Sequence, residues 1–283
     1  MHIITTMNFK GENEIVMCKA WIYFAKRFNP DATITIIHHD AISDIQQFAS
    51  TYHRIQFIKL SNKEMRPEMV NGYTDHPAQE LKLAVWKQTG KNGIHKYIYV
   101  DSDAFILGSL DTWWSHINDK PYIAVHEQVS PYTPVFNACV YSYGSKSGFV
   151  TYEKLLSQYR ADNNRIKIWA GDQGLINAYV RRIGYDYTHP LIDFTYNCIA
   201  KWCRIHTISD RSINIVSGRL PLIQRVYKKV HGRNREWWEQ WAWWNREKQV
   251  IILHAFGRKG FKFSELPECR PLWDYCKTVV KGK

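Results

Sequence analysis

Two acidic side chains that could hold a metal ion directly follow a hydrophobic run. Asp101 and Asp103 are separated only by Ser102 and come after the apolar stretch 97–100. Two carboxylates at this spacing can bind a hard divalent cation, such as magnesium or manganese, and leave coordination positions open for phosphate oxygens. Surface turns also contain such triplets by chance, so the position of the triplet in the fold decides its meaning.

That position favours a functional role. The run 97–100 is apolar throughout, which is typical of a parallel strand covered by helices on both faces. A second apolar run, 104–107, begins beyond the acids, so the carboxylates stand at a break between two buried segments. Acids rarely occupy such a place without a partner. The carboxyl ends of parallel strands are also where open α/β sheets bind ligands.

The elements that position these acids predict an α/β fold with a mostly parallel sheet. Strand-like and helix-like runs alternate in the first part of the chain, as in βαβ units. The helix expected over 78–89 carries Leu81 and Val85 on one stripe, and Gly90 and Gly93 mark its end. We expect strands at 3–6, 33–37, 54–60, 97–100, 122–125, 136–143 and 250–254, and helices at 14–28, 78–89, 148–163 and 172–182.

The composition indicates a globular chain with a strongly positive charge. The chain has 283 residues, of which 45% are hydrophobic, and this size suits one main domain. Its formal net charge is +12 and its pI is about 9.3, so its field attracts phosphate-rich partners. No apolar window approaches the roughly 18 residues of a spanning helix. No secretory signal is recognised at the start, and we therefore expect a cytoplasmic protein.

The cysteines indicate no zinc cage and no redox motif. Six cysteines are scattered along the chain without a C-x-x-C pair. We expect them to be reduced thiols, most of them buried.

An ordered series of short motifs runs from residue 3 to about residue 263. Its members are Thr5-Thr6, Lys82-Leu83, Tyr99-Val100-Asp101-Ser102-Asp103, Phe136-Asn137-Ala138-Cys139-Val140, Gly171-Asp172-Gln173-Gly174-Leu175-Ile176-Asn177, Tyr196-Asn197 and His254-Ala255-Phe256-Gly257. In order and spacing this series resembles the glycogenin-like members of glycosyltransferase family 8, which also includes bacterial lipopolysaccharide galactosyltransferases. The resemblance implies a GT-A fold, a uridine diphosphate (UDP) sugar donor, a manganese or magnesium ion, and transfer with retention at the anomeric carbon.

The resemblance also implies a role for individual residues. Asp101, Asp103 and His254 match the metal ligands, and an imidazole added to two carboxylates favours manganese over magnesium. Asp172 and Gln173 match residues at the donor sugar and are the candidates for catalysis. The other candidates for binding the donor are Thr5, Thr6, Phe9, Lys82, Ser102, Asn137, Ala138, Gly257 and Lys259.

Some of these candidates allow a second interpretation. Phe9 stands near where an aromatic ring against uracil is expected, and Lys82 would add positive charge at the diphosphate. Lys259 is one residue out of the family's register, and Cys139 replaces a glycine that is usual there. Asp172 also precedes a helix-like run and suits an N-cap. Whether a side chain or the acceptor attacks the anomeric carbon is left open.

A basic, tryptophan-rich segment, 225–248, bears on the acceptor. Trp237, Trp241 and Trp244 recur at helical spacing after a run of lysines and arginines. This pattern fits an amphipathic helix that packs its tryptophans into the core. It also fits a groove for nucleic acid, with a hydroxylated base flipped out for modification, or for an anionic glycolipid at a membrane surface. The spread of positive charge along the chain favours DNA.

The expected organisation follows from these assignments. We expect a GT-A nucleotide-sugar and metal-binding core over 1–196, and an acceptor-side helical elaboration over 197–248. A C-terminal strand and loop, 249–283, would complete the metal site. An inactive sugar-nucleotide-binding module is the alternative from another functional class, and turnover of a sugar donor would distinguish the two.

Overall fold

The computed structural model describes residues 1–7, 11–61, 64, 77–118, 120, 122–126, 136–144, 154, 157, 173, 176–177, 179–180, 183–187, 189–199, 203–217, 248–254 and 269–282. The strands are β1 (His2–Met7), β2 (Thr33–His38), β3 (Ile55–Lys59), β4 (Lys96–Val100), β5 (Ala104–Ile106), β6 (Tyr122–His126), β7 (Phe136–Gly144), β8 (Cys198–Ile199), β9 (Cys203–Ile208), β10 (Ile213–Ser217) and β11 (Ile252–His254). The helices are α1 (Glu12–Phe28), α2 (Ser43–Ala49), α4 (Pro77–Lys91), α5 (Asp111–His116) and α10 (Arg270–Lys281), with a 3-10 turn at Phe194–Tyr196.

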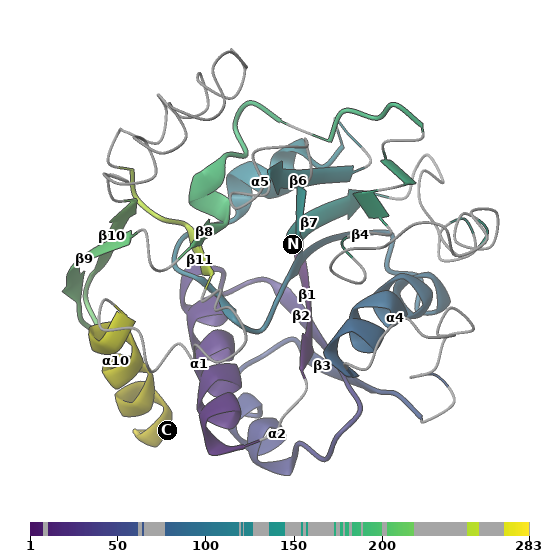
Figure 1. Ribbon diagram of the computed structural model, residues 1–283. Coiled ribbons are helices and arrows are strands. Elements are labelled where there is room, and N and C mark those ends of the chain that lie inside the picture. The colour runs from purple at the N-terminus through teal and green to yellow at the C-terminus, as the bar shows by residue number, and fades with distance from the viewer. Residues whose placement is uncertain are drawn as a thin grey trace.

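A six-stranded sheet with the order β3-β2-β1-β4-β7-β6 forms the centre of the fold (Figure 1). The first four strands in this order run parallel to one another. β7 is antiparallel to both β4 and β6. The sheet is therefore mixed and mostly parallel, which confirms the fold class that the alternating pattern predicts.

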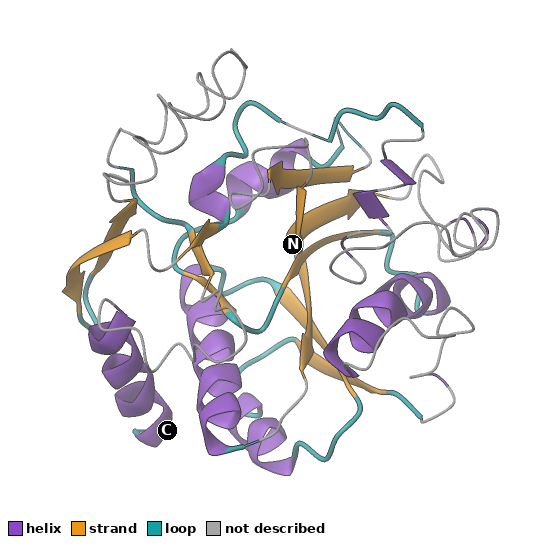
Figure 2. Cartoon of the chain, in the orientation of Figure 1, coloured by secondary structure: helices purple, strands orange, loops and turns teal. Residues whose placement is uncertain are grey.

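Helices cover both faces of this sheet (Figure 2). Side chains alternate between the two faces along each strand, and β4 shows this directly. Ile98 and Val100 belong to the buried cluster that contains α1 and α2, whereas Tyr97 and Tyr99 belong to the cluster that contains α4. The apolar run of β4 is thus buried on both sides, as its sequence predicts.

Helix α4 is slightly longer than expected. Leu81 and Val85 are fully buried, which confirms the predicted stripe. The helix passes through Gly90 and ends at Lys91. Gly93 then takes a positive φ of 65°, a backbone conformation that favours glycine and commonly ends helices.

A small second sheet brings the C-terminal part of the chain to the end of β4. It has the order β5-β11-β8. β11 is antiparallel to β5, with His254 opposite Ala104, and β11 is parallel to β8. Because Ala104 directly follows Asp103, this register places His254 beside the second acid of the triplet.

Most of the expected elements are present. Each of the seven expected strands is found, with shifted ends, and so are the helices near 14–28 and 78–89. Gln173, Ile176 and Val180 are helical, in agreement with the helix expected at 172–182. The helix expected at 148–163 lies almost entirely outside the described residues. The sequence did not predict four further features, which are α2, α5, the β9-β10 hairpin and α10.

The burial of the cysteines agrees with the expectation from the sequence. All six cysteines are free, and five of them are buried, while Cys139 is half-buried. In the part of the chain that is described, no helix is both long enough and apolar enough to cross a membrane.

Candidate active site

The two acids of the triplet belong to one tight turn between β4 and β5, with Asp101 at its start and Asp103 at a central position. The Ala104 N–H donates to the Asp101 carbonyl at 3.0 Å, which closes a four-residue turn over Ser102 and Asp103. The Asp101 N–H donates to the Cys139 carbonyl at 2.8 Å, so Asp101 stays attached to β7. The turn therefore holds the first carboxylate against the sheet and directs the second one elsewhere.

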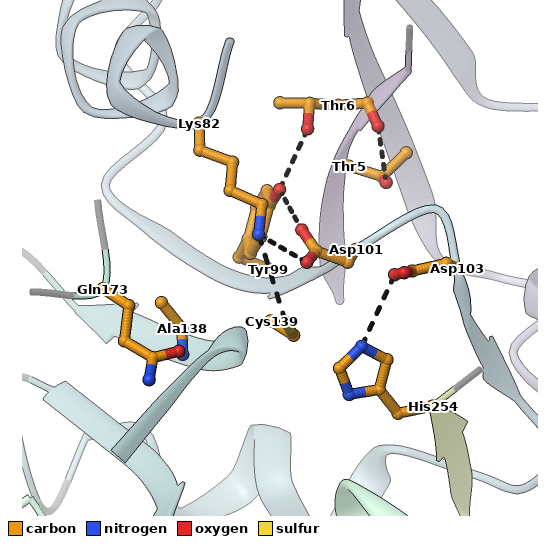
Figure 3. Close-up of polar contacts among 10 residues, drawn as sticks. All are labelled: Thr5, Thr6, Lys82, Tyr99, Asp101, Asp103, Ala138, Cys139, Gln173 and His254. Atoms are coloured by element: carbon orange, nitrogen blue, oxygen red, sulfur yellow. Dashed lines mark hydrogen bonds and ion pairs between the residues drawn. The ribbon is translucent and has the colours of Figure 1, made fainter. Parts of the chain in front are cut away.

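The buried Asp101 carboxylate has a partner on each oxygen (Figure 3). Lys82 Nζ, from α4, lies 2.6 Å from Oδ2. The Tyr99 hydroxyl donates to Oδ1 at 2.6 Å. A buried carboxylate needs such paired and hydrogen-bonded surroundings, because desolvation of its charge is costly. Lys82 and Asp101, both predicted from the sequence, are thus brought together.

Tyr99 connects this pair to β1. Its hydroxyl lies 2.9 Å from the hydroxyl of Thr6. Burial and then the charge of Asp101 raise the pKa of Tyr99 well above its usual value. The hydroxyl therefore stays protonated and donates a hydrogen bond to Asp101. Thr5 and Thr6 are both buried at this end of β1.

Asp103 and His254 form the second contact of the site. Asp103 Oδ1 lies 3.7 Å from Nε2 of His254, whose side chain is 1% exposed, whereas that of Asp103 is 42% exposed. Burial would lower the pKa of His254, but the facing Asp103 carboxylate raises it above its usual value. Desolvation would raise the pKa of Asp103, but His254 lowers it. Each residue thus favours the charged form of the other.

The side chains of Asp101, Asp103 and His254 are of the types that bind a divalent cation. Carboxylate oxygens and an imidazole nitrogen suit manganese, and the charge of Asp101 also acts on His254. The contact between Asp103 and His254 places two of the three predicted ligands close together. As they stand, however, the described residues contain no group of three His, Cys, Asp or Glu side chains arranged around one ion. The two Asp101 oxygens contact Lys82 and Tyr99.

The expected sugar-side residues meet at β7. The Ala138 N–H donates to Oε1 of Gln173 at 3.1 Å, and Asn177 donates through its side chain to the Gln173 carbonyl at 2.8 Å. The main chain of β7 thereby fixes the orientation of the Gln173 amide. Asn137 lies on β7, but its side chain is outside the described part, as are Phe9, Asp172, Gly257 and Lys259 as a whole.

Two further residues lie in the site without an assigned role in the sequence analysis. Tyr99 belongs to one of the motifs, but the sequence analysis gives its hydroxyl no role. Its spacing from Asp101 could have indicated the contact, because residues two positions apart on an extended strand face the same side. Cys139, the departure from the family pattern, has its Sγ 4.0 Å from Lys82 Nζ.

The sheet, its second small sheet and the strand-end site define the chain as having the GT-A fold of glycosyltransferases. A crystal structure of the galactosyltransferase LgtC, in complex with donor and acceptor sugar analogues, superposes with a TM-score of 0.64 at 13% identity. The match covers 100% of this chain and 96% of that one.

Two other solved structures agree with this fold. The glycosyltransferase GlyE of Streptococcus pneumoniae has a TM-score of 0.59 at 13% identity, over 99% of this chain and 61% of that one. Mouse xyloside xylosyltransferase 1 has a TM-score of 0.58 at 15% identity, over 92% and 99%. In sequence, the chain matches no protein-family model and no curated protein. Similarity at these identities establishes the fold.

Proposed function

We propose that the chain is a metal-dependent, retaining glycosyltransferase of the family 8 type, which transfers a hexose from a UDP-sugar to an anionic acceptor. The observation that carries this proposal is the contact between Asp103 and His254 beside the Lys82–Asp101 pair. Two segments far apart in the chain converge there at the end of β4, where α/β sheets bind their ligands. The resemblance of the motifs to family 8 supports the same assignment.

The charged residues suit the departing diphosphate. Asp101, Asp103 and His254 would hold the cation, which supplies Lewis-acid stabilisation of the leaving group when bound. Lys82 would add positive charge at the same place after its ammonium group moves from Asp101 to the phosphates. Before the donor binds, Lys82 neutralises Asp101 at 2.6 Å. The buried charge of Asp101 is therefore compensated within the chain.

The sugar-side residues suit recognition of hydroxyl groups. Sugar hydroxyls require amide and carboxylate groups at fixed angles. The bond from the Ala138 N–H fixes the Gln173 amide, and Asp172, its neighbour in sequence, supplies a carboxylate. We propose both residues as the catalytic candidates at the anomeric carbon.

The acceptor proposal rests on charge. A net charge of +12 exceeds what a nucleotide donor requires, and its spread along the chain supports DNA with a hydroxylated base as the first acceptor to test. A glycolipid is the second candidate. It is similar to the acceptor of the LgtC structure only in having a sugar part, since that structure was solved with an acceptor sugar analogue.

Donor hydrolysis tests the catalytic proposal before any acceptor is known. The purified protein is incubated with a panel of UDP-sugars and manganese, and released UDP is measured. We expect release from at least one donor, loss of release when a chelator removes the metal, and a product with the donor's anomeric configuration by NMR. Binding of UDP-sugars without turnover of any of them, with or without candidate acceptors, would instead identify an inactive binding module.

A further inference from the structure

Tyr99 stands between two parts of the candidate site. Asp101 directly follows β4 and lies on the same side as Tyr99, two residues before it. Both face α4: Tyr99 belongs to the buried cluster that contains α4, and Asp101 contacts Lys82 of that helix. The register pairs Ile4 of β1 with Tyr99, so Thr6, two residues farther along β1, lies on this face at the level of Asp101. The Tyr99 hydroxyl contacts both, at 2.9 Å from the Thr6 hydroxyl and 2.6 Å from Asp101 Oδ1 (Figure 3).

A stack of aromatic rings holds the Tyr99 side chain in place. Its ring stacks on that of Tyr141, its partner across the β4-β7 ladder, with centroids 4.9 Å apart. Tyr141 in turn stacks on Trp86 of α4, with centroids 5.4 Å apart and ring planes at 4°. All three residues are buried. A fully buried ring that stacks on another buried ring has little rotational freedom, so the position of the Tyr99 hydroxyl is well defined.

The same helix therefore positions both partners of Asp101. Lys82 and Trp86 are four residues apart on α4 and so lie on one face of that helix. Lys82 reaches Asp101 Oδ2 directly, whereas Trp86 acts on Oδ1 through the stacked rings. Lys82 has a flexible stem and can move, but the hydroxyl of Tyr99 cannot follow such a movement.

We propose that Tyr99 is a positioning residue, which holds the Asp101 carboxylate in the direction required to bind a divalent cation. The inference rests on the proposed function. A carboxylate oxygen has two lone pairs, so Oδ1 can accept from Tyr99 while Asp101 binds the cation. Without the hydroxyl, Asp101 can rotate towards Lys82, and the cation must then compete with a less restrained ion pair. Hydrogen-bond partners of metal ligands commonly have this effect on metal affinity.

The test is manganese binding by the full chain without a donor. The free ion is measured by electron paramagnetic resonance. For Tyr99→Phe, we expect a dissociation constant about ten- to a hundredfold higher than that of the wild type. Tyr97→Phe is the matched control, because Tyr97 is on the same strand and the same face and is also fully buried. We expect that control to bind manganese as the wild type does. Raising the manganese concentration should increase the turnover of Tyr99→Phe, because the expected loss concerns affinity for the ion.

The possible outcomes separate this inference from the proposed function. If the wild type binds manganese and releases UDP, and Tyr99→Phe binds the ion equally well, Tyr99 has no positioning role and the inference falls alone. If both phenylalanine variants lose affinity and melting temperature alike, the hydroxyl is merely structural, and the inference also falls. If the wild type neither binds manganese nor hydrolyses any donor, the proposed function and this inference fall together.

Discussion

At the scale of residues, the two acids of the triplet meet different surroundings although they are only two positions apart. Asp101 is buried and already neutralised by Lys82. Asp103 is partly exposed and faces His254. An incoming cation would therefore meet Asp103 first, and would gain Asp101 only by competing with Lys82. This difference makes Asp103 and His254 the sharper pair for a test of the metal assignment.

We predict that Asp103→Asn and His254→Ala each abolish transfer and leave the fold intact, because each removes one ligand of the ion. The measurement is thermal melting with titrated manganese. A ligand at a hundredfold its dissociation constant stabilises the folded state by about 2.7 kcal/mol, and we expect this gain for the wild type only. Asp44→Asn, at an exposed acid on α2, is the control and should keep the gain. Full activity of either site variant at limiting manganese would contradict the assignment.

The second prediction at this scale concerns Asp172, which precedes Gln173 in the sequence and lies outside the described residues. Asp172→Asn should lower turnover far more than donor affinity, because a residue at the sugar matters most as positive charge develops at the anomeric carbon. Single-turnover rates are compared with the dissociation constant of the donor. Equal losses in both quantities would instead indicate a positioning or N-cap role.

At the scale of elements, sequence patterns correctly predicted the long and regular helices and strands. The buried strand β4 and the stripe of α4 were recognised because a continuous apolar run and a helical period are strong signals. β8 has two residues and β11 has three, and such short strands carry no period. Their pairing depends on contacts between distant segments, which a single sequence does not show.

Helix α10 is different, because its signals were present in the sequence. Pro271 lies in its first turn, a position where proline favours the start of a helix. Leu272, Cys276 and Val279 follow at helical spacing and are all buried. The helix packs on α1 and the β9-β10 hairpin at the edge of the fold (Figure 1). The Tyr275 hydroxyl adds a hydrogen bond to Asp210 at 2.7 Å.

We predict that Leu272→Ala destabilises the protein by about 2–5 kcal/mol, because it removes a fully buried leucine and leaves a cavity. Chemical denaturation measures the loss. Below the transition, manganese binding should be unchanged, because α10 contributes no residue to the candidate site. Lys277→Ala is the control on the same helix. Its ion pair with Asp274 is exposed, so it should cost well under 1 kcal/mol. A cost as small for Leu272→Ala would contradict the packing of α10.

At the scale of the whole molecule, the sequence predicted which residues could form a site but not how their charged groups pair. Motif order indicated Asp101, Asp103, Lys82 and His254, and the fold brings them to one strand end. The ion pair between Lys82 and Asp101 was not foreseen. The sequence indicated a role for Lys82 at the phosphates, and its ammonium group also compensates the buried charge of Asp101. The expected division into 1–196, 197–248 and 249–283 remains a prediction.

The acceptor is also a question for the whole molecule, because a net charge of +12 has no obvious purpose with a neutral oligosaccharide. A DNA strand that contacts several lysines and arginines must release counterions, so its affinity should fall steeply and linearly with salt on logarithmic axes. A neutral acceptor would show little slope.

The basic segment 225–248 allows a test of this charge effect. It contains the basic residues Lys228, Lys229, Arg233 and Arg235, which lie outside the described part of the chain. Replacing these four residues with alanine should flatten the slope and weaken transfer to DNA, while donor hydrolysis stays unchanged, because none of them is among the predicted metal and sugar residues. If DNA binding is undetectable at low salt, or if the fourfold variant keeps the wild-type slope, DNA is excluded as the acceptor proposed here, and an anionic glycolipid becomes the acceptor to test.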